Sequence, residues 1–542
     1  MLVNSTLKLE VDKQTVNYIS AWSVGQPAKS SATITVVQYE GIMYLVTNAH
    51  AVANSTYLKV KFNQGSTELP VTPVWVDPIM DIAIVETTST EAEAFLGTKV
   101  KPLEINTEFQ PSSTEVNAYG YPTGGKSLSF TKGHISRTEV STIAHSRLPG
   151  ITVQTSAPIN PGNSGGPITI VREKQEECIG IVSQGASSLS NVGYFIPACT
   201  IVQTIENYKR FGALRARQFI DYVTVPQVSF EWQTLKNPSL RSELEMQDSL
   251  ESEPLGIRVS QVPPKSCAYN HLREGDVILE IDGHQIHADG NVQVKELENP
   301  ISYLYLLQRK KYLDEIEFVI QRKNDEGESE TLKITIRLTE QLGRSIVGPK
   351  TDKPLKYHIQ PSGKNGGYVF VRCTQPLMDT FTTSYSTGQK VIVDKSNVPP
   401  MFGEFSRLSP KKDGYELVVL QEILVSEDTD GYENFALNRG GMCESDRVTE
   451  VNGEPIANLW DLVVALTKDP RKPSLVKFAN GKELVIAPEA AQVREALKSK
   501  YQIAFFTSPK VAPILQLPFL DEINQLNKEE GAGNSSAMSL SY

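Results

Sequence analysis

The sequence predicts a mainly β protein, and three observations support that class. Short β-branched and alternating runs recur through residues 30–205, with Gly, Pro, Asn and Ser between them, which is typical of an all-β barrel or sandwich. Two later segments, GDVILEIDG at 275–283 and DRVTEVNG at 446–453, share a strand–turn–strand pattern. The 542 residues, 39% of them hydrophobic, supply enough apolar material for several cores.

Residues 1–215 are expected to form the first domain, because evenly spaced short strands end there in a helix-like stretch at Ile196–Phe211. The expected strands are Ala32–Tyr39, Met43–Val46, Tyr57–Phe62, Ile82–Glu86, Val116–Tyr119, Ile151–Thr155 and Cys178–Val182.

Two copies of a smaller domain are expected at 216–342 and 343–492. Their strand–turn–strand segments lie 170 residues apart, which is too far for a solenoid repeat but suits a duplicated domain with an insertion. The stretch Leu342–Pro354 carries Gly, Pro and Lys and is expected to link them. Residues 493–542 are expected to be a C-terminal extension, partly disordered in its Gly/Ser/Asn-rich tail.

Charge and cysteine usage exclude several functions. The chain has 53 Lys and Arg against 63 Asp and Glu, for a net charge of −10, so nucleic acid is not expected as the main partner. The five cysteines stand far apart without a Cys-x-x-Cys pair, which disfavours a disulfide framework and a zinc cluster. We therefore expect reduced thiols, no metal and no cofactor.

The N-terminal residues also bear on location. No stretch approaches the 18 apolar residues of a transmembrane helix. Charges at Lys8, Glu10, Asp12 and Lys13 leave no apolar centre for a signal peptide, and the segment is not an Arg-rich transit peptide. We therefore expect an intracellular protein, in the cytosol or the nucleus.

The strongest chemical signal is NPGNSGGP at 160–167. Glycines on both sides of Ser164 allow a tight turn that exposes the hydroxyl and aims the N–H groups of Gly162 and Ser164 at one point. That arrangement is an oxyanion hole, although an ordinary Gly/Ser loop has the same composition.

Two further segments complete a catalytic set. His50 ends the apolar run before it, and Asp81 opens a buried run, where an unpaired carboxylate is costly. Alone, each has a structural explanation, as a packed imidazole or as a turn aspartate. The order His50, Asp81, Ser164 on a β-rich domain is the chymotrypsin-like order, which differs from that of subtilisin and of the α/β-hydrolases. A lipase or esterase is therefore disfavoured.

A family resemblance follows from these motifs. TNAH at 47–50, DIAIV at 81–85 and GNSGGP at 162–167 resemble the HtrA/DegP family of trypsin-like serine proteases. GIRV at 256–259 and REGDVILEIDG at 273–283 resemble its PDZ domains, and FEWQ at 230–233 resembles the plant-type Deg branch with a divergent second PDZ domain. The resemblance implies a chymotrypsin-like double β-barrel followed by two PDZ-like α+β domains.

The resemblance also implies residue roles. Ser164 is the nucleophile, His50 the general base and then acid, and Asp81 the group that orients the imidazole, with Asp77 as second choice. The oxyanion hole is formed at Gly162, Asn163 and Ser164. The residue before the nucleophile is Asn163, so the charged pair that activates trypsin zymogens is absent, and the loops Gly120–Ser129 and Ser183–Asn191 are candidates for control.

Primary specificity is inferred from the S1 pocket. By resemblance, its base lies at Pro158, and the lining residues contain no carboxylate to pair with Lys or Arg: Pro158, Ile159, Asn160, Ile181, Val182 and Ser183. We therefore expect cleavage after small or medium aliphatic residues.

Peptide binding is expected at the first PDZ-like domain, with capture at Leu255, Gly256, Ile257 and Arg258. The third domain lacks the matching glycine, so a structural or subunit-contact role is at least as well supported there. Together these features predict an ATP-independent serine endopeptidase of protein quality control. It is expected to cleave unfolded or damaged proteins and to form a homo-oligomer. The alternative is a PDZ-based scaffold or holding chaperone with an inert protease domain.

Overall fold

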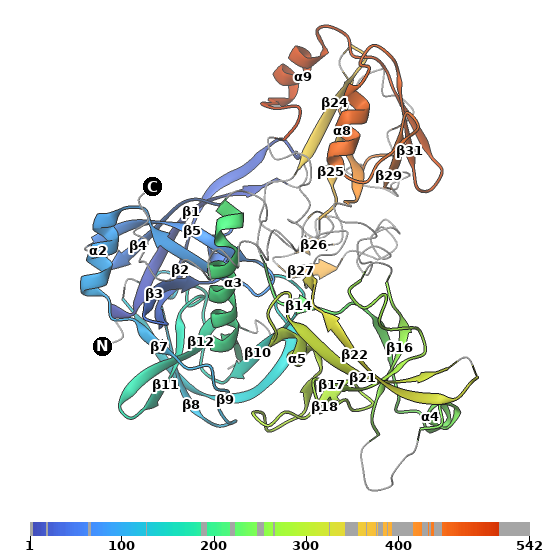
Figure 1. The fold of residues 1–542 in the computed structure, drawn as a ribbon. Helices are drawn as coiled ribbons and strands as arrows, with labels where there is room; N and C mark the ends of the chain where they lie inside the picture. Colours follow the sequence, from blue (N-terminus) through green and yellow to red (C-terminus); the bar gives the residue numbers. More distant parts are fainter. Residues whose placement is uncertain are drawn as a thin grey trace, which may run out of the picture.

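The computed structural model describes residues 4–508, except for 217–222, 247–253, 342–355, 393–415, 425–431, 438–446 and gaps of up to six residues elsewhere. Figure 1 shows three β-rich parts: the blue-to-green part, the yellow-green part beside it, and the orange part beyond the ends of β1 and β2. The mainly β class expected from the sequence is confirmed. The predicted boundaries stay proposals.

The first part is a thirteen-stranded sheet that closes twice on itself. Strands in the order β1-β4-β5-β6-β3-β2 form one barrel, closed by pairing of β1 with β2. The second barrel runs β12-β11-β8-β9-β10-β13 and closes by pairing of β12 with β13. The short strand β7 runs parallel to β2 and β12 and joins the barrels. The predicted double β-barrel is therefore confirmed.

The bounds of these elements are β1 Thr6–Val16, β2 Val24–Tyr39, β3 Ile42–Thr47, α1 Ala49–Val52, β4 Ser55–Phe62, β5 Thr67–Asp77, β6 Ile82–Thr87, α2 Thr90–Lys99, β7 Leu103–Ile105, β8 Glu115–Gly120, β9 Ser129–Thr142, β10 Pro149–Thr155, β11 Pro167–Arg172, β12 Gln175–Gly185, β13 Gly193–Pro197 and α3 Ala198–Ala216.

Alternation along the strands fills the barrels. In β4 the side chains of Leu58, Val60 and Phe62 are buried while their neighbours face outward, as a half-buried strand requires. A separate core lies between the barrels and includes the fully buried Trp75 and Ile79. Helix α3 covers this core with Ile201 and Ile205. The side chains between the two barrels are therefore closely packed, and they give rigid support to a site that lies there.

The middle part is a sheet ordered β15-β16-β17-β21-β22, with β18 paired to β17. Its turn at Asp282-Gly283 has positive φ at both residues (49° and 74°), as the predicted Asp-Gly hairpin requires. Its elements are β14 Pro226–Gln227, β15 Glu231–Thr234, α4 Pro238–Glu243, β16 Ile257–Gln261, β17 Val277–Ile281, β18 His284–Gln285, β19 Asn291–Val292, β20 Ile301–Ser302, α5 Leu304–Gln308, β21 Glu315–Lys323, β22 Ser329–Arg337 and β23 Glu340–Gln341.

The last part repeats the hairpin at Asn452-Gly453, again with positive φ (52° and 85°). Its elements are β24 Tyr357–Ser362, β25 Gly366–Arg372, β26 Thr383–Ser386, β27 Gln389–Ile392, β28 Val418–Leu424, β29 Val448–Val451, β30 Glu454–Pro455, α8 Leu459–Thr467, β31 Ser474–Phe478, β32 Glu483–Ile486 and α9 Val493–Tyr501.

The core of the last part extends past the predicted boundary at 492. Val493 and Leu497 of α9 and the following Ile503 and Phe506 pack with β24 and β25. We therefore propose that this domain runs to about residue 508. The predicted C-terminal extension beyond that point, 509–542, lies outside the described residues.

The β1–β2 turn reaches this same core. Ala21 and Trp22 belong to it, and the Trp22 indole N–H donates to the Tyr501 carbonyl over 3.0 Å. The two rings meet edge-on at 6.2 Å. The first and last parts of the chain are therefore in direct contact.

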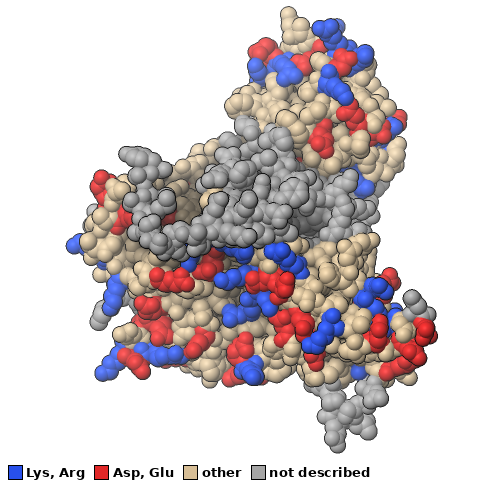
Figure 2. Space-filling view, in the orientation of Figure 1, with Lys and Arg blue, Asp and Glu red and all other residues tan. Residues whose placement is uncertain are grey.

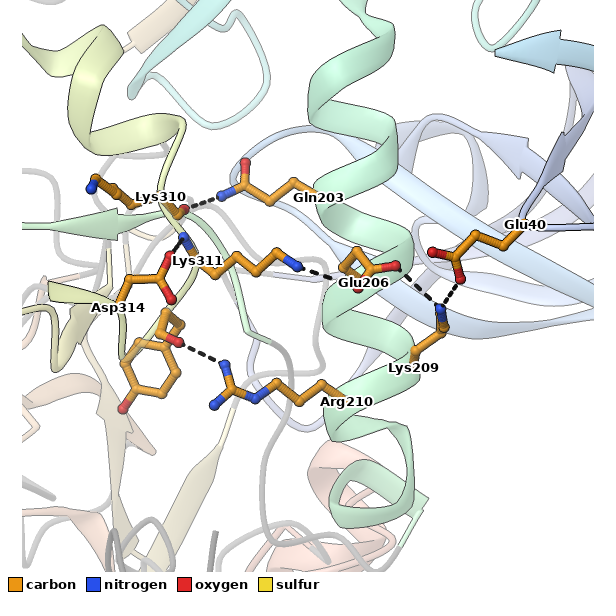
Figure 3. A network of polar contacts seen from close by, with 9 residues as sticks. Glu40, Gln203, Glu206, Lys209, Arg210, Lys310, Lys311 and Asp314 are labelled. Carbon is orange, nitrogen blue, oxygen red and sulfur yellow. Dashed lines mark hydrogen bonds and ion pairs between the residues drawn. The ribbon is translucent and has the colours of Figure 1, made fainter. Parts of the chain in front are cut away.

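A polar interface joins α3 to the middle part. Figure 3 shows Gln203, Glu206 and Arg210 projecting from α3 toward the segment 310–314. The Arg210 guanidinium donates to the Tyr312 carbonyl over 3.0 Å, and Glu206 pairs with Lys311. These contacts tie the segment that follows α5 to the first part, and Gln308, the last residue of α5, makes a second attachment.

Gln308 is 4% exposed and bridges directly to β10. Its amide carbonyl accepts from the Ile151 N–H over 3.0 Å, and its amide N–H donates to the Pro149 carbonyl over 2.9 Å. Substitution Gln308→Ala leaves these two backbone groups unpaired, at a cost of about 1–3 kcal/mol. We expect amide hydrogen exchange of α5 to accelerate at least about fivefold. The exposed Gln285→Ala is the matched control, and equal exchange in both variants would contradict this role for Gln308.

No helix in the described residues has both the length and the apolarity needed to cross a bilayer. On the face in Figure 2, Lys and Arg side chains alternate with Asp and Glu, in keeping with the net charge of −10. The four described cysteines, Cys178, Cys199, Cys267 and Cys373, form no disulfide.

Candidate active site

Three connections of the two barrels meet at the inter-barrel core. His50 lies in α1 immediately after β3, and Asp81 lies in the turn between β5 and β6. Ser164 lies in the connection between β10 and β11 of the second barrel. The predicted catalytic residues therefore come from both barrels.

His50 and Asp81 form a close pair. The His50 Nδ1 atom lies 2.8 Å and 2.9 Å from the two carboxylate oxygens of Asp81. The His50 backbone N–H also donates to Asp81 Oδ1 over 2.9 Å. A carboxylate on Nδ1 fixes the tautomer that leaves Nε2 able to accept a proton.

Asp81 is completely buried and remains ionised. Burial alone raises the pKa of its carboxyl, but the charge and hydrogen bonds of His50 outweigh this and lower the pKa below the usual value. Ser183 also donates to Asp81 Oδ2, over 3.2 Å. The sequence reasoning assigned Ser183 to the S1 pocket and so missed this support.

Asn48 is a second residue without a predicted role. Its buried side-chain amide donates to the Asp81 carbonyl over 3.0 Å and so ties α1 to the β5–β6 turn. Its position in the TNAH motif is the sequence signal that could have identified it.

Asp77, the second choice for orienting His50, has a structural role. Its Oδ1 accepts from the N–H groups of Ile79 and Met80, over 2.9 Å and 3.1 Å, which is a turn aspartate. Burial raises its pKa to about 6, partly offset by these two hydrogen bonds. Of the two aspartates, Asp81 is the one that contacts the imidazole.

The pKa of Asp77 in the folded chain is above its unfolded value of 3.8. The stability that the protonated carboxyl contributes to the fold is therefore fully present below pH 4 and is lost as the pH rises to about 6. Asp77→Asn keeps the acceptor oxygen and removes the buried charge. We expect the variant to gain up to about 3 kcal/mol in unfolding free energy at pH 8 and to lose this gain at pH 4. Denaturant unfolding at both pH values measures it. A variant destabilised equally at both would show that the charge is not costly.

The Ser164 connection is tied to the first barrel. The Thr33 N–H donates to the Ser164 carbonyl over 2.9 Å, and the Thr33 hydroxyl donates to the Gly162 carbonyl over 2.8 Å. Ser164 is half-buried, and its hydroxyl makes no hydrogen bond within the described part of the chain. The nucleophile is thus held by its backbone while its side chain is left available.

Gly162 needs the absence of a side chain. Its φ is +99°, and a Cβ atom there would lie 2.4 Å from the Tyr121 carbonyl oxygen. Among the described residues, the amides of Asn163 and Gly165 have carbonyl acceptors, whereas those of Gly162 and Ser164 have none. These are the two donors expected for an oxyanion hole.

The six predicted S1 residues do not share one environment. Ile181 and Val182 are fully buried in the inter-barrel core and the second barrel, and Ser183 faces Asp81. Pro158 and Asn160 are exposed. Ile159 lies over Gly193, where an added Cβ would come within 2.4 Å of its Cδ1 atom. Residues 186–191, part of a predicted control loop, lie outside the described residues.

The predicted peptide site at Leu255, Gly256, Ile257 and Arg258 is contradicted by the strand pairing. Strand β16 pairs with β15 on one edge and β17 on the other, so no peptide strand can add there. The Gly256 N–H donates to the Ile286 carbonyl, and the Leu255 carbonyl accepts from Arg241. The edge strand is β15, since the sheet order begins with it.

One neighbour of His50 comes from a segment that no motif marked. The His145 ring, in the β9–β10 connection, stacks on the His50 ring with centroids 3.8 Å apart and planes 10° apart.

Two protein families match parts of this chain. A trypsin-like peptidase domain family matches residues 32–181, and a PDZ domain family matches residues 349–510. Protease Do-like 2, chloroplastic, of Arabidopsis thaliana is 28% identical over 99% of this chain and 80% of its own length. Protease Do-like 4, mitochondrial, from the same plant is 28% identical over 89% of this chain and 82% of its own.

Among solved structures, the HtrA-type protease AlgW with a decapeptide is 20% identical, with a TM-score of 0.44 over 62% of this chain and 96% of that one. The relatives' names contradict the expected cytosolic or nuclear location. Protease Do-like 2 is chloroplastic, and Do-like 3 and 4 are mitochondrial, which points to an organelle. Charges near the N-terminus were therefore a poor guide to location.

Proposed function

We propose that this chain, a trypsin-like serine protease similar to the Do-like, or HtrA/Deg, enzymes, is an ATP-independent endopeptidase. The proposed catalytic residues are His50, Asp81 and Ser164. The observation that carries the proposal is the buried Asp81 carboxylate held against His50 Nδ1 at 2.8 Å. A scaffold with an inert protease domain has no need of this costly buried charge.

The proposed reaction requires the Ser164 hydroxyl, which makes no hydrogen bond within the described residues, to come within reach of His50 Nε2 when a substrate binds. Ser164 Oγ attacks the scissile carbonyl while His50 Nε2 takes its proton, and Asp81 stabilises the imidazolium that forms. The N–H groups of Gly162 and Ser164 receive the oxyanion. His50 then gives its proton to the leaving amine, and water releases the acyl group by the same steps in reverse.

The nucleophile can be tested without a variant. A fluorophosphonate probe phosphonylates only an activated serine, so we expect mass spectrometry to find one adduct, on Ser164, in the native chain and none after unfolding. An unlabelled native chain would favour the scaffold or holding chaperone instead.

We further propose cleavage after small or medium aliphatic residues. Ile159 over Gly193 leaves an apolar, restricted S1 region, and a buried Lys or Arg would lack a counter-charge there. Selectivity from apolar contacts is graded, at about 1–3 kcal/mol per methylene. We expect most casein cuts to follow Val, Ala, Ile or Leu. A majority of cuts after Lys or Arg would refute the assignment.

The middle part is proposed to be a PDZ domain that captures peptides along β15. Beside β15 lies a groove of about 250 Å³, lined by the apolar side chains of Val228, Phe230, Leu304 and Leu307. The Phe230 ring stacks on Tyr303 at 5.9 Å, which supports one wall. Within the described residues β15 pairs only with β16, and an open sheet edge beside a groove with both apolar and polar lining fits strand addition by unfolded or C-terminal segments. Assembly into a homo-oligomer is proposed by analogy with the family.

A further inference from the structure

His145 has no part in the proposed mechanism, yet it completes a cluster of metal-binding groups. One ligand atom from each of His50, Asp81 and His145 lies within 4.8 Å of the other two. All three residues line one cavity of about 280 Å³. Two imidazoles and a carboxylate around a shared space form a set of N and O donors suited to a small divalent ion.

The position of His145 is fixed by its neighbours on both sides. The Ala144 N–H donates to the Gln184 side-chain carbonyl over 2.8 Å, and the Arg147 N–H donates to the Ile143 carbonyl over 2.8 Å. Ile143 and Ser146 are buried, at 2% and 3% exposure. The imidazole is therefore presented by an ordered turn, which reduces the conformational entropy lost when it binds an ion.

The carboxylate of Asp81 is also held in position by its neighbours. The Ser183 hydroxyl and the His50 N–H orient its oxygens. Such hydrogen bonds to a ligating carboxylate are typical of metal sites. The two rings are stacked with planes 10° apart, so one ring must rotate about its side-chain bonds for both nitrogens to point at the same ion.

We propose that His50, Asp81 and His145 bind a divalent ion of the Zn²⁺ class and that the bound ion inhibits the protease. Imidazole nitrogens favour Zn²⁺ over Mg²⁺ or Ca²⁺, which prefer oxygen ligands. A metal on His50 prevents that ring from accepting the Ser164 proton. Binding is independent of the proposed function, and only the inhibition rests on it.

Peptidase assays with added ZnCl₂ test the inhibition. We expect reversible inhibition of the wild type that EDTA relieves, and at least about a tenfold higher inhibitory concentration for His145→Asn. His145→Cys retains a zinc ligand and is expected to restore sensitivity. Lys13 lines the same cavity, so Lys13→Gln, which removes a positive charge, is expected to increase sensitivity. The exposed His134→Asn is the matched control. Equal inhibition of His145→Asn and the wild type would overturn the proposal.

Cobalt spectroscopy separates binding from catalysis. The full-length Ser164→Ala chain, titrated with CoCl₂, is expected to give the visible bands of four-coordinate Co²⁺, and the additional change His145→Asn is expected to remove them. Bands that depend on His145, found together with a wild-type chain that cleaves neither casein nor peptides, would support the metal site and refute the proposed function. Absence of bands from Ser164→Ala would refute the metal site whatever the activity.

Discussion

Ser164→Ala is expected to abolish casein cleavage, with kcat reduced about a millionfold. The substitution removes only the hydroxyl, which makes no hydrogen bond within the described residues, while the Ser164 carbonyl keeps its bond to Thr33. The fold is therefore expected to survive, so thermal unfolding should match that of the wild type. Circular dichroism and a casein assay on the same preparation measure both.

The exposed Ser242→Ala on α4 is the matched control, and it is expected to retain full activity. Cleavage by Ser164→Ala at more than about one hundredth of the wild-type rate would mean that another residue is the nucleophile.

Asp81→Asn is expected to lower kcat about ten-thousandfold while leaving KM within a fewfold. The amide keeps one oxygen, but its NH₂ group is a donor that cannot accept from His50 Nδ1–H or from Ser183. The imidazole then loses both its orientation and the negative charge that stabilises its protonated form. A fluorogenic peptide with an aliphatic residue before the scissile bond provides kcat and KM separately.

Asp77→Asn is the matched control, because Asp77 is a buried carboxylate four residues away that contacts backbone amides instead of the imidazole. We expect its kcat to stay within a fewfold of wild type. Comparable losses in both variants would assign the effect to the β5–β6 turn and not to the contact with His50.

Much of the fold follows from local patterns. The Asp282-Gly283 and Asn452-Gly453 turns lie where the sequence predicted hairpins, because these residue pairs tolerate positive φ. Strand β1 was missed although it alternates cleanly, with Leu7, Leu9 and Val11 buried. The charged residues between these buried positions argue against a signal peptide, and that alone did not predict a strand.

Non-local features could not be predicted in the same way. The GIRV segment at 256–259 marks the start of β16 in the sequence but does not reveal that β15 covers its outer edge, since the pairing joins residues 23 to 30 positions apart. His145 lies in no recognisable motif and reaches His50 only because the connection between the paired strands β9 and β10 extends to the His50 ring. Conversely, His50 and Asp81 were predictable because each follows or opens an apolar strand of the same barrel.

The contact between Trp22 and Tyr501 has a consequence for how the chain folds during synthesis. The two residues are 479 positions apart, so both barrels have been synthesised before the partner of Trp22 emerges from the ribosome. Barrels built from these earlier residues can close first, because domains generally fold in order of synthesis. Until the last domain forms, the Trp22 indole lacks the carbonyl and the ring that it contacts in the folded chain. Folding of the last domain therefore covers an apolar surface that was made early.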